Sequence, residues 1–246
     1  MRGILATIGR ELRGYFLSPL GWVVAAMFLL YQGISFQIIL SYLSDPRAPA
    51  TMTPFAFLFG GFTFWLLLLF IAAVLTMRLI AEERRTGTLE MLLTAPITEG
   101  QVVLGKFLAA FLFYLFLWAP TLLYAVVVAR QGHVDWGPIA AGYLGAAGIG
   151  ALLLAVGIFA SALSRNQVVA AILSFTFFFL FFTPAFLESL VNDPQLRDAL
   201  QYVNIYQHME DFGRGIVDSR HLVYYLSTTV LFLFLASRAV EAAKGK

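Results

Sequence analysis

The stretch that decides the fold is Arg78-Leu-Ile-Ala-Glu-Glu-Arg-Arg-Thr-Gly-Thr-Leu-Glu-Met-Leu-Leu-Thr-Ala-Pro96, a charged insert between two segments apolar enough to cross a bilayer. Its charged residues fall within thirteen positions: Arg78, Glu82, Glu83, Arg84, Arg85 and Glu90. Over the whole chain of 246 residues, only 12% are charged and 60% are hydrophobic. A soluble fold of this size cannot bury so much apolar surface, so we expect a membrane protein.

Six apolar stretches are long enough to span the hydrocarbon core, which takes about 20 residues of helix. They cover approximately residues 20–40, 56–77, 102–129, 139–163, 167–186 and 221–237. The fourth is rich in glycine and alanine, which favours close packing against other helices. The fifth has six phenylalanines between Phe175 and Phe182, which indicate contact with lipid or neighbouring helices. We therefore predict an all-α integral membrane protein, with one transmembrane domain over residues 1–246.

The distribution of Lys and Arg predicts that both termini are cytoplasmic, because positive charge is retained on that side. Ten basic residues then lie in cytoplasmic segments: Arg2, Arg10, Arg13, Arg78, Arg84, Arg85, Arg165, Arg238, Lys244 and Lys246. Five lie in outer segments: Arg47, Arg130, Arg197, Arg214 and Arg220. This topology places the charged insert in the cytoplasm.

The first nineteen residues predict an amphipathic helix in the plane of the lipid headgroups. Its apolar residues recur at helical spacing, and the basic ones project from the opposite side; the apolar set is Ile4, Ile8, Leu12, Tyr15 and Phe16. The alternative is a basic flank that only fixes topology. In the outer segment at 187–220, Asp193-Pro194 is typical of a helix start, and the pattern that follows predicts short helices that dip into the outer membrane surface.

The sequence offers little catalytic chemistry. It has no cysteine, which excludes disulfides and thiolate metal sites, and its net charge of +2 is no basis for binding nucleic acid. His208, Glu210 and Asp211 lack a specific metal-ligand spacing. Gly100-Gln-Val-Val-Leu-Gly105-Lys106 resembles the start of a phosphate-binding loop, but Phe107 replaces the Ser or Thr that would hold magnesium. We predict neither a cofactor nor a metal in this chain.

No ionisable residue falls deep within a predicted span, although such groups mark the ion pathway of secondary transporters. Lys106 lies near the inner end of the third span, where we expect its long side chain to reach the membrane surface. Energy for any transport against a gradient would therefore come from outside this chain.

The insert is the place where that energy is expected to enter. Leu89, Leu92 and Leu93 form an apolar patch, Gly87 interrupts the charged helix before it, and Thr88 is placed to cap a second short helix. Such an element fits a groove in another protein. The alternative is a solvated loop held by local Glu-Arg pairs.

The residues from Met77 to Ile97, together with Val103-Leu-Gly-Lys-Phe107, closely resemble the cytoplasmic segment of ABC-2 type permeases, the membrane subunits of a class of ATP-binding-cassette transporters. Ala162-Leu-Ser-Arg-Asn-Gln167, and Phe212-Gly-Arg-Gly-Ile-Val-Asp218 with His221-Leu-Val-Tyr-Tyr225, are similar to the branch described as gliding-motility-associated permeases.

The resemblance implies an elbow helix before the first span, a coupling helix within residues 78–100, and re-entrant helices within 187–220. It also implies a bacterial or archaeal inner-membrane protein in which two permeases, identical or related, pair with two cytosolic ATPase subunits that bind ATP and Mg. This chain would then not be an enzyme. Carried over by position, the ATPase-contacting residues are Glu82, Glu83, Arg84, Arg85, Gly87, Thr88, Leu89 and Glu90. The apolar patch adds Leu92 to this set. Arg165 and Asn166 would form a second, smaller contact with the ATPase.

The function expected is that of a permease subunit, an exporter, that couples ATP hydrolysis on a partner to the movement of a substrate or to signalling across the membrane. The alternative is a non-transporting scaffold that anchors a cytosolic complex to an envelope protein. An intramembrane enzyme is disfavoured, because no predicted span supplies a convergent set of acidic, histidine or serine side chains. The sequence does not identify the substrate.

Overall fold

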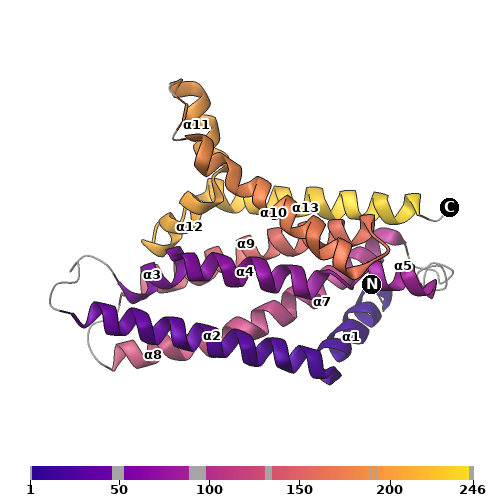
Figure 1. The fold of residues 1–246 in the computed structure, drawn as a ribbon, viewed down its shortest axis with the longest axis horizontal. Coiled ribbons are helices and arrows are strands. Elements are labelled where there is room, and N and C mark those ends of the chain that lie inside the picture. The colour runs from indigo at the N-terminus through magenta and orange to yellow at the C-terminus, as the bar shows by residue number, and fades with distance from the viewer. Residues whose placement is uncertain are drawn as a thin grey trace.

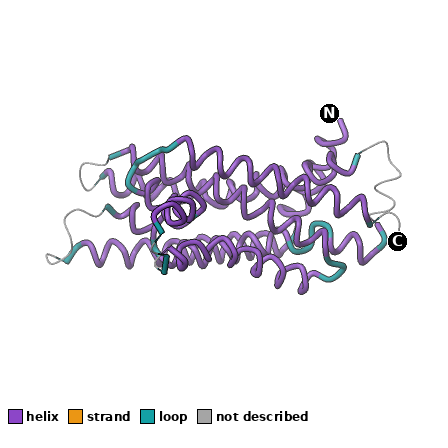
Figure 2. Tube along the Cα trace, turned by 90° about the horizontal axis from the view of Figure 1, so that it is seen from above, coloured by secondary structure: helices purple, strands orange, loops and turns teal. Residues whose placement is uncertain are grey.

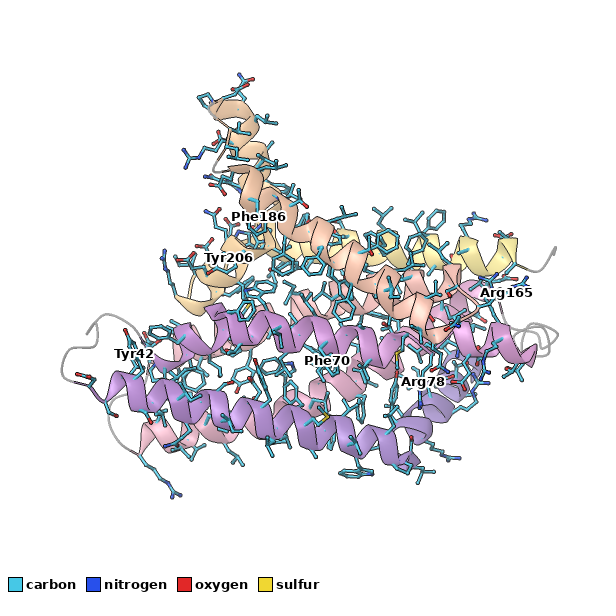
Figure 3. The ribbon with its side chains drawn as sticks, in the orientation of Figure 1. Tyr42, Phe70, Arg78, Arg165, Phe186 and Tyr206 are labelled. Atoms are coloured by element: carbon cyan, nitrogen blue, oxygen red, sulfur yellow. The ribbon has the colours of Figure 1, made fainter. Side chains whose placement is uncertain are left out.

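The computed structural model describes residues 2–45, 53–88, 98–130, 135–188, 190, 191 and 193–243. Within these ranges the chain forms helices and turns, with no strand. Six helical segments are long and apolar enough to cross a membrane, as predicted. They run along one elongated bundle, and both termini lie at the same end (Figures 1 and 2). We call this the charged end, because it also carries α5 and Arg165, and we call the opposite end the far end (Figure 3).

The N-terminal helices start at recognisable caps. Helix α1 covers Arg2–Leu17, and α2 (Pro19–Leu43) begins where the Ser18 side chain accepts from the Leu20 amide. Helix α3 (Pro54–Gly60) is capped by Thr53 and also starts with proline, whose fixed φ suits the first helical position. The first predicted span is thus confirmed with slightly wider bounds.

The second predicted span, 56–77, is confirmed as a crossing, but its bounds differ and a break divides its residues between two helices. The chain leaves helical geometry at Gly61, which has φ −73° and ψ 155°, and this residue separates α3 from α4 (Phe62–Thr76). A Cβ at Gly61 would lie 2.6 Å from the carbonyl oxygen of Phe57, so the break depends on glycine. A turn after α4 leads into α5 (Ala81–Thr86), which extends this crossing toward the charged end.

The third crossing is also interrupted. Helix α7 (Glu99–Trp118) begins with a capping box, in which Thr98 and Gln101 each bind the other's backbone amide. It ends at a 3-10 turn, η1 (Ala119–Thr121), because Pro120 has no amide hydrogen to donate. Helix α8 (Leu122–Ala129) completes the crossing.

Helix α9 (Trp136–Leu163) is the central element, as its small residues predict. In the apolar windows of α9 and of the crossing that begins at α4, 72% of residues are buried, against 22% in α10 (Gln167–Glu188) and α13 (Ser219–Ala242). Glycines of α9 admit large neighbours: a Cβ at Gly142 would lie 2.3 Å from the ring of Phe59, and one at Gly150 would lie 2.4 Å from the ring of Tyr114.

Two short helices precede the last crossing. Helix α11 (Pro194–Val203) starts at the predicted Asp193 cap and has no buried residue, and it projects away from the bundle (Figure 1). Helix α12 (Ile205–Gly213) is capped by Asn204 and packs against α9 and α3. The short helices predicted at 187–220 are therefore present, while their depth in a membrane stays a prediction.

Candidate functional site

Helix α5 carries the densest charge of the described chain, and its first turn is attached to α9 through a serine hydroxyl group. Ser161 Oγ accepts hydrogen bonds from the amides of Ile80 (3.2 Å) and Ala81 (3.0 Å), and it donates to the carbonyl oxygen of Met77 (3.1 Å). The first amides of a helix have no hydrogen-bond partner within the helix, and a side chain close by in the sequence usually accepts from them. Ser161 takes this capping role for α5 from a distant helix. The fourth crossing therefore sets the position at which α5 begins.

A buried ion cluster joins α5 to two further helices. Lys106 Nζ on α7 lies 2.9 Å from Glu11 Oε1 on α1 and 2.8 Å from Glu83 Oε1 on α5. Arg10 NH2 donates to the same two oxygens, at 2.7 Å from Glu11 and 2.9 Å from Glu83. We call these four residues the Lys106 cluster. Its two cations and two carboxylates cancel, so it needs no outside charge.

The position predicted for Lys106 is wrong. Its side chain is 1% exposed and turns toward the two carboxylates, instead of reaching the membrane surface. Removing a charge from water is costly unless it is paired and hydrogen-bonded, and the two carboxylates meet that need. Burial by itself would raise the pKa of Glu11, but the charges and hydrogen bonds of Lys106 and Arg10 prevail and hold that pKa below its ordinary value.

The apolar face of α1 packs against protein. The rings of Tyr15 and Phe113 stack with centroids 4.8 Å apart, and the Tyr15 hydroxyl donates to the carbonyl oxygen of Leu75 (2.7 Å). Gly105 of α7 leaves room for Thr7, whose Cβ would lie 2.8 Å from an added methyl group. Helix α1 is thus amphipathic as predicted and is held to α7 and α4; its placement in the headgroup plane stays a prediction.

Two of the predicted contact residues lie near the C-terminal end of α9. Arg84 donates through NH1 to the carbonyl oxygen of Ala162, near the end of α9. Arg165 is exposed in the turn that follows, where Asn166 accepts from the Val168 amide through its side chain (2.8 Å). Residues predicted as separate contacts therefore lie on one surface.

The remaining predicted residues of the insert are more exposed. Glu82 and Arg85 form a local pair at 3.9 Å, and Gly87 ends α5 with φ 72°, a conformation that favours glycine. The Thr88 hydroxyl lies 2.9 Å from that of Thr86. Leu89, Glu90 and Leu92 lie outside the described residues.

A half-open cavity of about 440 Å³ lies between α1 and α5. Glu82, Arg78 and Thr88 line it together with Glu11, Glu83 and Lys106. The cavity places the Lys106 cluster directly behind the surface that α5 presents.

Comparison with known families agrees with this arrangement of helices and charges. Residues 25–243 match the family model described as ABC-2 family transporter protein. The chain belongs to this family. No match to it is found among curated proteins. Membership makes it the membrane subunit of an ABC transporter, a multi-pass protein, and the family implies a partner ATPase subunit.

Four residues that position α5 in this ABC-2 family protein were not predicted as site residues: Arg10, Glu11, Lys106 and Ser161. A signal existed for two of them, because Glu11 is the only acidic residue before Asp45 and Lys106 is the only charged residue between Glu99 and Arg130. Pairing them requires knowing that α1 packs on α7, which periodicity within either helix does not state. Ser161 carries no signal, since a serine in an apolar helix is ordinarily bonded within its own helix.

At the far end of this family member, His208 stacks on His221 with ring centroids 4.0 Å apart. His208 Nε2 lies 3.2 Å from the carbonyl oxygen of Tyr202, and its Nδ1 is buried without a hydrogen-bond partner in the described structure. Among the described residues, no group of three or more His, Asp or Glu side chains is placed to hold a metal. Burial, and then the charge of His221, lower the pKa of His208 to about 4.

This shift predicts a loss of stability in acid. Unfolded His208 binds a proton as the pH falls below about 6.5, whereas the folded residue resists protonation until about pH 4. The free energy of unfolding therefore decreases between these two values, by on the order of 1 kcal/mol at pH 5. Thermal unfolding at pH 7.5 and pH 5 measures it, and His208→Gln is expected to flatten the dependence. An equal loss in that variant would contradict the assignment to His208.

Proposed function

We propose that the chain is the permease subunit of an ABC exporter whose ATP and Mg are bound by two separate ATPase subunits. We further propose that the charged end faces the cytoplasm, so that both termini and α5 lie there. The distribution of basic residues supports this orientation, since positive charge is retained on the cytoplasmic side.

The observation that carries the proposal is the attachment of α5 to three helices of the bundle. Ser161 joins α5 to α9, and the Lys106 cluster joins it to α1 and α7. A charged element that only fixed topology would not need these buried contacts. A force applied to α5 by an ATPase would instead pass directly into helices that cross the membrane.

The mechanism follows from this attachment. Closure of the ATPase dimer on ATP displaces α5 and the turn at Arg165, and the attached helices tilt with them. Alternating access then requires a second permease copy or a paralogue. The exposed apolar faces of α2, α10 and α13 offer room for it beside the surrounding lipid. Helix α11, which is exposed along its length, is available to an envelope partner.

Purification from gently solubilised membranes tests the proposal. The wild-type chain is expected to retain an ATP-hydrolysing subunit. Charged replacements at Leu89 and Leu92 are expected to release that subunit while the chain still inserts in the membrane with the same topology. A wild-type preparation without an ATPase, or unchanged retention in the variants, would contradict the proposal. The first of these results would favour the scaffold function.

The residue patterns around Arg165 and from Phe212 to Tyr225 support placing the chain in the gliding-motility-associated branch. We propose this placement on those patterns alone. It adds no substrate, since the branch is defined by sequence.

A further inference from the structure

The surface around α5 holds two arginines brought together from positions 84 and 165. Arg84 is half-buried, and NH1 is fixed on the carbonyl oxygen of Ala162. Arg165 follows three residues later in the chain and is exposed. The hydrogen bond to Ala162 places the Arg84 guanidinium at the end of α9, three residues before Arg165 in the chain. The fold thus holds two like charges together at its charged end.

These arginines differ from four other cations at the charged end. Arg10, Arg85, Lys106 and Arg238 each lie within 4.0 Å of a carboxylate. Arg78 also has no such partner in the described ranges, but it lies in the turn before α5 and not at the end of α9. Within the described ranges, neither Arg84 nor Arg165 has such a partner. Two adjacent like charges disfavour each other, and an anion between them removes that cost. The charges of the Lys106 cluster balance, whereas those of the arginine pair do not, although Glu83 Oε2 in the cluster is buried without a hydrogen-bond partner in the described structure.

We propose that Arg84 and Arg165 together receive an acidic side chain, Asp or Glu, of the ATPase subunit. This inference rests on the proposed function, because it names the partner's chemistry at the same surface. Arginine suits the role, since its fork of donors matches the two oxygens of a carboxylate. Hydrogen-bonding to Ala162 occupies NH1 of Arg84, and the remaining donors of the guanidinium stay available.

A protein carboxylate fits this place better than a lipid phosphate. Arg84 is anchored to the backbone of α9 beside Ser161, within the group of helices that holds α5, and Arg165 lies in the turn between two crossings. An ATPase that displaces α5 would transmit force most directly through an ion pair at this point. One carboxylate between the two arginines would hold α5 and the α9–α10 turn together.

The experiment compares the retention of the co-purifying ATPase by charge-reversal variants of the full chain in lipid nanodiscs. Arg84→Glu and Arg165→Glu, singly and together, test the pair. Arg214→Glu and Arg238→Glu are the matched controls, because each of these arginines already has a carboxylate partner three or four residues away in the chain and neither is a predicted ATPase contact. The double variant Arg84→Lys, Arg165→Lys keeps both positive charges but loses the planar fork of guanidinium donors.

The double reversal is expected to weaken ATPase binding by about 10- to 100-fold, the usual effect of losing a hydrogen-bonded charge pair in an interface. The controls should stay within about threefold of wild type, as exposed ion pairs contribute little. Retention by the wild-type chain should fall as NaCl rises, and the double variant should lose most of this dependence. Reversal of one acidic residue on the ATPase should restore binding.

Three results would overturn the inference. One is a double reversal that binds the ATPase as tightly as the controls do. Another is the same loss from Glu90→Gln alone, which would show that the anion belongs to this chain. The third is binding that depends on anionic lipid and vanishes equally for all chains in zwitterionic nanodiscs. A wild-type chain that retains no ATPase contradicts the proposed function as well. Retention by wild type and the double variant alike contradicts only the arginine pair.

Discussion

Replacement of Lys106 by methionine is expected to lower the apparent melting temperature by roughly 6–12 °C. Methionine fills similar volume but leaves Glu11 and Glu83 near one another with only the exposed Arg10 to neutralise them. Removal of one partner from a buried ion pair costs about 3 kcal/mol or more, and 1 kcal/mol corresponds to about 2–4 °C in a chain of this size. Thermal unfolding in a fixed detergent measures the change.

The origin of this loss is tested by neutralising the carboxylates. The triple variant Lys106→Met, Glu11→Gln, Glu83→Gln leaves no buried charge without a partner. It should therefore be more stable than Lys106→Met alone, even though it also loses both carboxylates of the cluster. Lys106→Arg keeps the charge and should lie between wild type and methionine. If the triple variant were less stable than both Lys106→Met and Lys106→Arg, the unpaired carboxylates would not be the cause of the lost stability.

Replacement of Gly150 by alanine is the second large effect expected. The added methyl group would lie 2.4 Å from two ring carbons of Tyr114. That ring is 1% exposed, and its hydroxyl donates to the carbonyl oxygen of Ala146 (2.8 Å), so it has little freedom to move. Overpacking of this kind costs about 1–3 kcal/mol, which exceeds the gain of up to about 1 kcal/mol that alanine brings to a helix. Thermal unfolding is again the measurement.

Gly9→Ala is the matched control, since a Cβ there meets no atom within 4 Å. It should be neutral or slightly stabilising, because only helix propensity changes. Adding Tyr114→Leu to Gly150→Ala should recover part of the loss by making room for the methyl group. Equal stability of Gly9→Ala and Gly150→Ala would mean that α7 and α9 are not closely packed at this point.

The sequence predicted the six crossings and the central place of α9, because span length and small-residue content are local properties. It also predicted the start of α11 at Asp193. The breaks at Gly61 and Pro120 were harder to predict, because the apolar character of the chain continues across them. The mean hydropathy of a segment does not change where only the backbone geometry changes.

At the candidate site, sequence reasoning found the exposed charges and missed the contacts that hold them. Glu83 and Arg84 stand out as charges in an apolar chain, whereas their partners depend on how distant helices pack. Lys106 shows why: the sequence places it at the end of a span, and water is the simplest partner there. Only the packing of α1 over α7 brings Glu11 close enough to replace water.

The pairing of Lys106 with Glu11 has a consequence for biosynthesis. The two residues are separated by 95 positions, so the carboxylate leaves the ribosome well before its cation does. At 5–20 residues per second, the delay is roughly 5–20 s. During that interval α1 has no Lys106 to bind and its acidic side chain remains hydrated. The first helix of the chain therefore reaches its final place only after the third crossing has been made.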